Sequence, residues 1–439
     1  MRGIGRVQLK TLIKARKYLK KFNSFKFNSE KNNIFYLSPF YNSSGLFKLR
    51  ELSNSNLFKN EGFFAILKDI LFSTYYSNNY CHHKLKHFSF SRIIISWGKK
   101  SDFSKDGVFN DKYFNISSKY KNSSYLWYLI YIDNQLPKKI THNVIIFQPI
   151  KYKLFNPIVL IKNFLINLNF FFLSHDYLLT SLTSQAFLSK LTIKNFLNLN
   201  LSKVKIVNIP YEGQPFQNEL IRVIKGINPN AKIIGYMHAP PLPVPANLIK
   251  KSFSPDKIIV NGSDQKKLFK KYLGWKKEKI IIKPSSRFRY NGNLKKNFIY
   301  LPVNIKQLNN IKKILIILHN KKMINLKNFK IKKHPSSIGE HHAENLITDF
   351  KTIKKQLKIN KNIKFKNPLI FVGSTGGIIE ALEKNLSVIH LSEEPIFDLY
   401  SEEIWPNISS IQIYKNVYIY KLKKRGQMLK LGEKKTRYF

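Results

Sequence analysis

Short apolar runs, separated by polar and glycine-rich turns, follow one another along the chain from residue 92 onward. Apolar runs of about four to eight residues, bounded by turn residues, are typical of strands buried in a parallel sheet. The pattern predicts a first series of strands at residues 93–97, 126–132, 143–147, 205–209, 232–237 and 257–260, and a second series at 298–303, 329–332, 369–372 and 387–391.

Between these strands, apolar residues recur at helical spacing. Helices are expected at residues 158–173, 177–188, 219–226, 264–273 (with Ser263 as N-cap) and directly after the turn at 373–377. Because strands alternate with helices, the sequence predicts an α/β protein with two doubly wound, Rossmann-like lobes that face a central cleft. The turn-rich segment 283–296 separates the lobes, so we expect a poorly readable segment at 1–88, an N-terminal lobe at 89–285 and a C-terminal lobe at 286–439.

The chain carries a formal net charge of +51, and such a charge is typical of proteins that bind nucleic acid. Of the 76 basic residues, however, 66 are lysine, and they are spread from end to end beside many Asn, Ile, Phe and Tyr residues. All of these residues have A/T-rich codons. A nucleotide bias of the genome therefore accounts for the charge better than nucleic-acid binding does, and an anionic membrane surface stays open as a partner.

Cysteine use and hydropathy limit the class of protein. A single cysteine, Cys81, excludes a disulfide framework, and the histidine pairs at 82–83 and 341–342 lack zinc spacing, so both are expected at the surface. The basic N-terminus lacks the apolar stretch of a signal peptide. The apolar window 154–173 is interrupted by polar residues, which indicates a core helix. We expect a cytoplasmic protein, with peripheral attachment to the inner face of the cell membrane as an addition.

The turn Gly-Ser-Thr-Gly-Gly at 373–377 joins a predicted buried strand to a predicted helix. Free backbone N–H groups at the start of a helix, with the hydroxyls of Ser374 and Thr375 beside them, favour an anion site, most plausibly for phosphate. An ordinary N-cap is the alternative, at about equal weight. The turn matches neither the P-loop nor the dinucleotide-binding fingerprint.

Three further candidates follow predicted strands, where ligands of such sheets bind. His334, which precedes Pro335, could donate a hydrogen bond to a phosphate or protonate a leaving group, or lie in a surface turn. Glu212 could take a proton from a hydroxyl, or cap the following helix. His238 is a weaker candidate for a substrate contact, and it precedes a proline-rich loop at 239–245 that suits a cleft wall or lid.

In this order, Glu212-Gly213, His334-Pro335 and Ser374-Thr375 resemble motifs of bacterial GT-B glycosyltransferases of surface-carbohydrate biosynthesis, and most of all sialyltransferase-related families. Those families carry an acidic-acidic-Gly triplet, a His-Pro pair and a Ser/Thr pair. A weaker likeness covers residues 93–114. Tyr211 stands at the first acidic position, so the triplet is incomplete and the donor sugar is less well indicated than the class.

The resemblance implies roles for these residues. Glu212 would be the general base, and His334 would assist departure of the nucleotide; Gly213 and His238 would contact the substrate. Donor-binding residues would be Pro335, Ser336, Gly373, Ser374, Thr375, Gly376, Gly377 and Glu380, the last near the ribose or base.

The implied activity is transfer of a sugar from a nucleotide-sugar donor to a cell-surface glycan acceptor, as in capsule or lipopolysaccharide synthesis. A CMP-activated acidic sugar is the leading donor. The chain has no Asp-x-Asp stretch, so transfer is expected without a metal, and no cofactor is expected. A nucleotide-sugar epimerase on the same scaffold and a basic nucleic-acid-binding protein are the alternatives.

Overall fold

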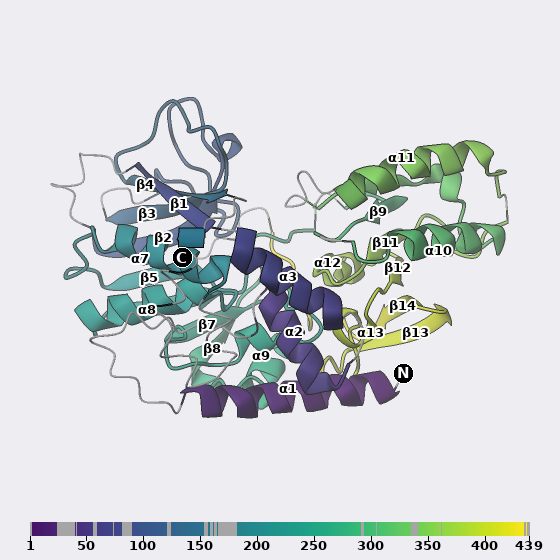
Figure 1. The fold of residues 1–439 in the computed structure, drawn as a ribbon, viewed down its shortest axis with the longest axis horizontal. Helices are drawn as coiled ribbons and strands as arrows, with labels where there is room; N and C mark the ends of the chain where they lie inside the picture. Colours follow the sequence, from purple (N-terminus) through teal and green to yellow (C-terminus); the bar gives the residue numbers. More distant parts are fainter. Residues whose placement is uncertain are drawn as a thin grey trace.

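The computed structural model describes residues 2–23, 40, 42–55, 59–72, 74–80, 90–120, 124–152, 157–158, 161, 165, 182–290, 294–303, 305–334, 341–360, 362–433 and 436. Two β-sheets with helices on their faces lie side by side (Figure 1). The α/β class predicted from the alternating pattern is therefore confirmed. Residues 81–89, which hold the chain's single cysteine, lie outside the described ranges, as do most of the predicted helix at 158–173 and residues 177–181 of the predicted helix at 177–188.

Within the described residues, the first sheet has eight strands in the order β1-β4-β3-β2-β5-β6-β7-β8, and all but β1 run parallel. This order is compatible with a Rossmann-like lobe. Three longer helices belong to this half. Its elements are β1 (Thr74–Tyr80), β2 (Arg92–Gly98), β3 (Tyr125–Tyr131), β4 (Val144–Tyr152), α7 (Ser184–Phe196), β5 (Ile206–Pro210), α8 (Pro215–Ile227), β6 (Lys232–Tyr236), β7 (Lys257–Val260), α9 (Ser263–Lys271) and β8 (Ile280–Ile282), with short 3-10 turns η2 (Lys100–Asp102), η3 (Ala246–Leu248) and η4 (Lys277–Lys279).

The second sheet is mixed. In the part of the chain that is described it has six strands in the order β10-β9-β11-β12-β14-β13, of which the first four are parallel and the last two form an antiparallel hairpin. Its elements are β9 (Phe298–Tyr300), α10 (Leu308–Asn320), η5 (Leu326–Asn328), β10 (Lys330–Lys332), α11 (His341–Gln356), β11 (Leu369–Val372), α12 (Gly377–Glu383), β12 (Val388–Leu391), α13 (Pro395–Asp398), β13 (Ile408–Tyr414) and β14 (Val417–Leu422).

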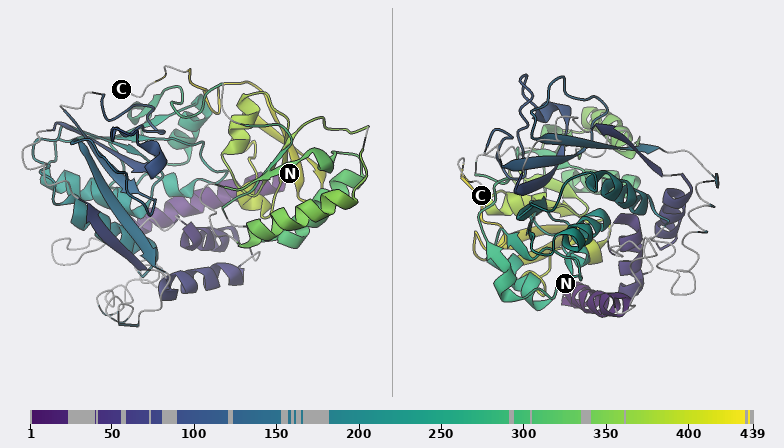
Figure 2. Two further views of the ribbon diagram at one scale, coloured as in Figure 1. Left: turned by 90° about the horizontal axis from the view of Figure 1, so that it is seen from above. Right: turned by 90° about the vertical axis from the view of Figure 1, so that its left-hand side faces the viewer.

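The N-terminal segment, which the pattern left unassigned, forms α1 (Arg2–Asn23), α2 (Asn42–Ser53) and α3 (Lys59–Phe72). Helix α1 runs along the lower edge of the molecule in Figure 1 and passes across both halves in Figure 2. It contacts η3 of the first half and α13 of the second. The N-terminal helices therefore join the two halves.

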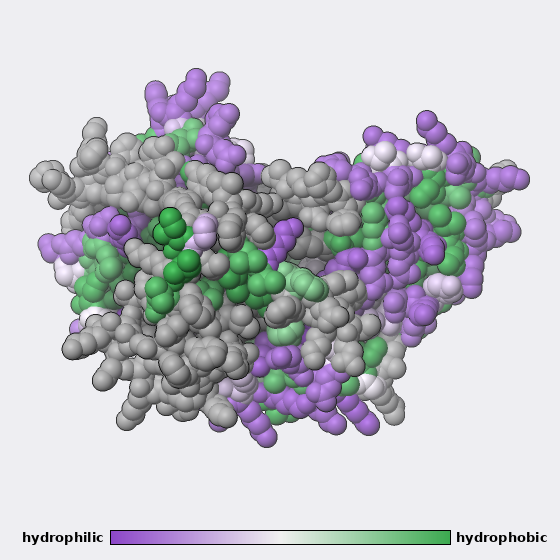
Figure 3. All heavy atoms as spheres, viewed as in Figure 1, coloured by the Kyte–Doolittle hydropathy of each residue, from purple (hydrophilic) through white to green (hydrophobic). Residues whose placement is uncertain are grey.

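One hydrophobic cluster extends through both halves. It includes Ile93 and Ile209 of the first sheet, Leu369 and Phe371 of the second, and Leu12 of α1, all buried. On the face seen in Figure 3, hydrophilic side chains gather over the half that carries α10 and α11 and along the edge that carries α1. The predicted limits of the lobes, at residues 88/89 and 285/286, stay predictions.

Two predicted helix starts were wrong, for reasons outside the local pattern. Within the described residues, the helix predicted at 177–188 begins only at Ser184, where the Asp69 carboxylate of α3 accepts hydrogen bonds from the Ser184 backbone N–H and hydroxyl, both at 2.9 Å. Ser263 is the first residue of α9 rather than its N-cap, and its hydroxyl binds the Gln427 side chain. In both places a residue distant in sequence accepts an N–H group at the start of the helix: Asp69 that of Ser184, and the Gln427 carbonyl that of Asp264.

Candidate active site

Both sheets have a point at which the strand order reverses, and ligands of such sheets bind at the carboxyl ends of the strands there. In the first sheet this point lies between β2, which carries Trp97 near its end, and β5, which leads into Glu212. In the second it lies between β9 and β11, and β11 leads into the turn at Gly373. The predicted residues Glu212 and Gly373 therefore stand where the topology favours a binding site.

Glu212 and His238 form a close pair. His238 Nε2 lies 3.0 Å from Glu212 Oε1, while the Gln214 amide donates to Oε2 at 2.6 Å. About a third of the Glu212 side chain is exposed, whereas the His238 side chain is 6% exposed and its Nδ1 is buried without a partner in the described structure. Glu212 is thus partly exposed, whereas His238 is buried and contacts the Glu212 carboxylate.

The pKa of the Glu212 carboxyl is lowered from its usual value. Burial by itself raises that pKa, but the charge of His238 and hydrogen bonds from His238 and Gln214 outweigh it, and Arg287 adds to them. Glu212 is therefore a carboxylate near neutral pH, able to accept a proton from a hydroxyl group.

Two aromatic side chains, Trp97 of β2 and Tyr113 of the loop that follows it, pack against His238. Tyr113 meets the imidazole edge to face, with 4.7 Å between ring centroids, and Trp97 lies 5.9 Å away. Burial raises the pKa of Tyr113 to about 12, and the charges of Arg287 and Glu212 act on it in opposite directions. Tyr113 therefore stays protonated and can donate a hydrogen bond at neutral pH. Both aromatics fall in the stretch 93–114, where the sequence shows its weaker family likeness.

The loop that carries Glu212 is held from three sides. Gln217, in the first turn of α8, accepts the backbone N–H groups of Glu212 and Gln214 at 3.0 and 3.2 Å, which is why α8 begins at Pro215, earlier than predicted. Asn247 donates to the Glu212 carbonyl at 2.6 Å. Gly213 has a φ of +69°, and a Cβ there would lie 2.1 Å from the Asn247 carbonyl oxygen. Glycine is therefore required at this position by its conformation and by its neighbour.

Arg287, in the segment between the sheets, is a site residue that the sequence did not single out. Its guanidinium lies over the rings of Tyr113 and Phe288, 5.4 and 5.3 Å from their centroids, and it forms no salt bridge within the described residues. Its charge lowers the pKa values of both Glu212 and His334. A signal was present, because Arg287 and Arg289 lie two residues apart in a chain with ten arginines, but charge counting alone did not reveal it.

His334 follows β10 and lies half-buried within electrostatic reach of Arg287. Burial, and secondly the Arg287 charge, lower the pKa of its imidazole. At neutral pH it is therefore uncharged, which favours a hydrogen-bonding role over proton donation. Pro335 and Ser336 lie outside the described residues.

The turn at 373–377 is fixed from β12. His390, fully buried, donates from Nε2 to the Gly373 carbonyl at 2.8 Å and bonds Tyr420 through Nδ1; burial lowers its pKa to about 4, so it stays neutral. Gly373 has a φ of +63°. Thr375 Oγ1 accepts the Gly377 N–H at 3.2 Å, whereas Ser374 Oγ is buried without a partner in the described structure. Thr375 therefore makes a local hydrogen bond within the turn, and the buried Ser374 hydroxyl is left without a partner among the described residues.

Helix α12 after this turn has only seven residues, with Gly376 as its N-cap. Its dipole is correspondingly small. Glu380, predicted near the ribose or base, instead binds Lys384 at 2.6 Å on the same helix, and its charge raises the pKa of Tyr300 only as a lesser cause. The structure gives Glu380 a helix-stabilising partner rather than an open carboxylate.

The proline-rich loop 239–245 brings the two sheets' candidate residues together. The Tyr400 hydroxyl donates to the Pro241 carbonyl, and Trp405 Nε1 to that of Pro243, both at 3.1 Å. A Cβ on Gly376 would lie 3.1 Å from the Pro240 carbonyl oxygen. Because two residues span at most about 7 Å, His238 lies close to this contact. Two hydrogen bonds from the second half therefore hold this loop of the first half.

Tyr211, at the position of the missing acidic residue, belongs to the core. It is fully buried, and its hydroxyl donates to Asn218 Oδ1 at 3.0 Å. Burial raises its pKa well above the usual value. Tyr211 therefore supports the Glu212 loop and does not offer a second carboxylate.

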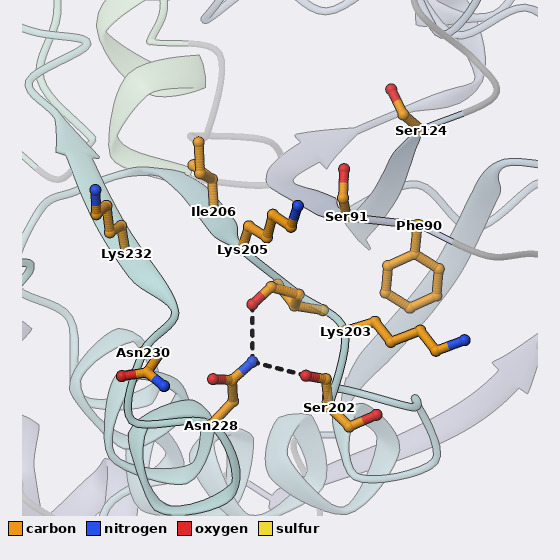
Figure 4. Close-up of a pocket in the computed structure, with 11 residues that line it drawn as sticks. Phe90, Ser91, Ser124, Ser202, Lys203, Lys205, Ile206, Asn228, Asn230 and Lys232 are labelled. Carbon is orange, nitrogen blue, oxygen red and sulfur yellow. Dashed lines mark hydrogen bonds between the residues drawn. The ribbon is translucent and has the colours of Figure 1, made fainter.

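A cavity of about 1000 Å³ opens at the opposite edge of the first sheet, at the amino ends of β2, β5 and β6. Ser91, Lys205 and Lys232 line it, and Asn228 closes its floor by donating to the carbonyls of Ser202 and Val204 at 3.0 and 2.8 Å (Figure 4). No predicted site residue is among its described lining residues. This cavity is separate from the candidate site.

Within the described ranges, no three His, Cys, Asp or Glu side chains gather closely enough to hold a metal ion. Among the described helices, none is both long and apolar enough to cross a bilayer.

Comparison with known proteins gives no relative: no family model, no curated protein and no solved structure matches this chain.

Proposed function

We propose that the protein is a glycosyltransferase that moves a sugar from a nucleotide-sugar donor to a glycan acceptor, with its two sheets forming the lobes of a GT-B enzyme. One observation carries the proposal: Arg287 lies within electrostatic reach of both Glu212, on the first sheet, and His334, on the second. A carboxylate with a lowered pKa after a strand of one sheet and a neutral imidazole after a strand of the other are thus influenced by the charge of the same arginine, as expected for the two sides of a transfer site.

In this proposal the acceptor hydroxyl lies at Glu212. As its oxygen bonds the anomeric carbon, the hydroxyl proton passes to the Glu212 carboxylate, and the bond from that carbon to the phosphate oxygen breaks. Negative charge then grows on the departing phosphate, where donors already in place stabilise it most. Arg287 supplies the positive charge, and neutral His334 and the unpartnered Ser374 hydroxyl supply hydrogen bonds.

The leading donor is a CMP-activated acidic sugar, as the family resemblance implies, and attachment to an anionic membrane surface in the cytoplasm is part of the same proposal. The test incubates the full chain with a panel of CMP-, UDP- and GDP-sugars, with and without glycan acceptors, and separates products by mass spectrometry. Acceptor-dependent release of nucleotide supports a transferase. Formation of an isomeric nucleotide sugar without acceptor would instead support the epimerase, and tight, salt-sensitive RNA binding without turnover would support the nucleic-acid alternative.

Glu212→Gln identifies the base. The amide keeps the shape but cannot take a proton, so we expect kcat to fall at least about 100-fold while nucleotide affinity, measured by calorimetry, changes little. Glu278→Gln, at an exposed residue of η4, is the matched control and should leave kcat unchanged. Full turnover in Glu212→Gln would exclude Glu212 as the base.

A further inference from the structure

A second cavity, of about 440 Å³, lies next to the candidate site. Its walls come from the loop after β2 and from the segment that joins the two sheets, and they include Lys112, Asn115, Arg287 and Arg289. Arg287, whose charge lowers the pKa of Glu212, lines this cavity, and so does Lys112, the neighbour of Tyr113 in the chain. The volume is within the range of about 300–1,000 Å³ typical of small-ligand sites.

The two carboxylates in the cavity wall already have partners. Asp102 pairs with Lys112, and Asp111 accepts hydrogen bonds from the Ser96 hydroxyl and the Phe114 backbone N–H. Asp111 is 5% exposed. Neither carboxylate is therefore directed at the arginines, and neither competes with an anionic ligand for them.

The arginines, in contrast, have unused donors. Arg289 donates Nε–H to the Ser286 carbonyl at 3.2 Å, which leaves its terminal N–H groups, and within the described residues it forms no salt bridge. The Ser286 hydroxyl donates to the Tyr113 carbonyl at 2.5 Å, so the arginine segment is tied to the Tyr113 loop. A guanidinium held in this way presents a planar fork that matches a carboxylate or a phosphate.

We propose that this cavity binds an anionic group on the acceptor sugar, with Arg289 as the residue that sets specificity, so that the acceptor is an acidic sugar. The inference rests on the proposed transferase function, because it places the acceptor hydroxyl at Glu212. A carboxylate and a phosphate share the chemistry that the fork recognises, and the experiment distinguishes them.

The experiment measures binding without any donor. The full chain is titrated with methyl glucuronide, with methyl glucoside as its neutral counterpart, and with glucose 6-phosphate, using ligand-observed NMR. We expect the glucuronide or the phosphate to bind at least ten times more tightly than the glucoside, and the better of the two to identify the anionic group. Equal binding of charged and neutral probes, or no binding of either charged probe, would overturn the proposal.

Variants locate the site. Arg289→Gln should weaken binding of the charged probe at least tenfold. Arg289→Lys keeps the charge but loses the planar fork of donors, so it should weaken binding by less. Arg425→Gln, at an exposed arginine in the turn after β14, is the control and should change nothing. Unchanged binding in a folded Arg289→Gln protein would refute the cavity. Because no donor is used, failure of sugar transfer and failure of this site give separate results.

Discussion

At the residue scale, the decisive feature is that Glu212 and His238 act on each other. The imidazole lowers the pKa of a carboxyl whose burial would otherwise raise it. The low pKa therefore depends on the neighbour and not on exposure. Sequence reasoning placed both residues at strand ends, but it treated them as separate contacts.

We expect His238→Phe to raise the pKa of Glu212, because burial is then opposed only by Gln214 and Arg287. A base works only when ionised, so activity is lost as pH falls through that pKa. The acid limb of the pH profile of kcat/KM should therefore move to higher pH in the variant. An acid limb at the same pH as in the wild type would show that His238 does not set this ionisation.

The raised pKa of Asp111 leads us to expect that the stability of the protein depends on pH. Burial raises its pKa from 3.8 to about 6, so its contribution to stability is fully present below pH 4 and is lost as pH rises towards 6 and above. The shift corresponds to about 3 kcal/mol. Asp111→Asn removes the titration, so wild type should lose stability relative to the variant between about pH 4 and 6 in urea denaturation series. A constant difference over this interval would contradict the prediction.

At the element scale, the tight turn between β5 and α8 positions the Glu212 carboxylate, and its glycine cannot be replaced without strain. Gly213 has a positive φ and faces the Asn247 carbonyl, whereas Gly226, near the end of α8, has no atom within 4 Å of its virtual Cβ. The same substitution should therefore have opposite effects at the two positions.

Gly213→Ala should lower the free energy of unfolding by at least about 1–3 kcal/mol and reduce kcat, since the Glu212 loop must shift. Gly226→Ala should raise the free energy of unfolding by about 0.5–1 kcal/mol, because alanine has a higher helix propensity than glycine. Thermal unfolding of both variants, with activity assays on the folded fractions, checks this pair. Equal melting temperatures would show that the turn tolerates a side chain.

At the scale of the whole molecule, buried polar contacts hold helices α1 and α2 against the second half, while Asp69 of α3 binds Ser184 of α7 in the first half. Arg50 of α2 binds both carboxylate oxygens of Glu394 at 2.8 and 2.7 Å, and Lys306 adds a third contact at 3.0 Å. Gln8 of α1 donates to the carbonyls of Ile396 and Leu399, both at 2.7 Å. Since one hydrophobic cluster extends through both halves, relative motion of the halves would have to break this packing.

Arg50→Ala should lower the free energy of unfolding by about 3 kcal/mol, because it leaves a buried carboxylate with less compensation. Hydrogen exchange should rise in α1 and α13 together. Lys48→Ala removes a more exposed ion pair, in which Lys48 Nζ lies 2.9 Å from Glu51 Oε2, and should lower the free energy of unfolding by less than about 1 kcal/mol. If both variants unfold at the same urea concentration, the Arg50–Glu394 ion pair does not anchor α2 to the second half.

The sequence by itself determined the α/β class, most strands of both sheets and the glycine turns at 213 and 373, since short apolar runs and turn residues act locally. Strands β1, β8, β13 and β14 and helices α1–α3 were not predicted, because their patterns are weak without the packing that stabilises them. Only the tertiary structure paired Glu212 with His238, brought Arg287 within electrostatic reach of Glu212 and His334, and gave Glu380 a lysine partner. Those arrangements join residues from separate elements, and pKa values, exposure and unused hydrogen-bond donors depend on such neighbours rather than on spacing along the chain.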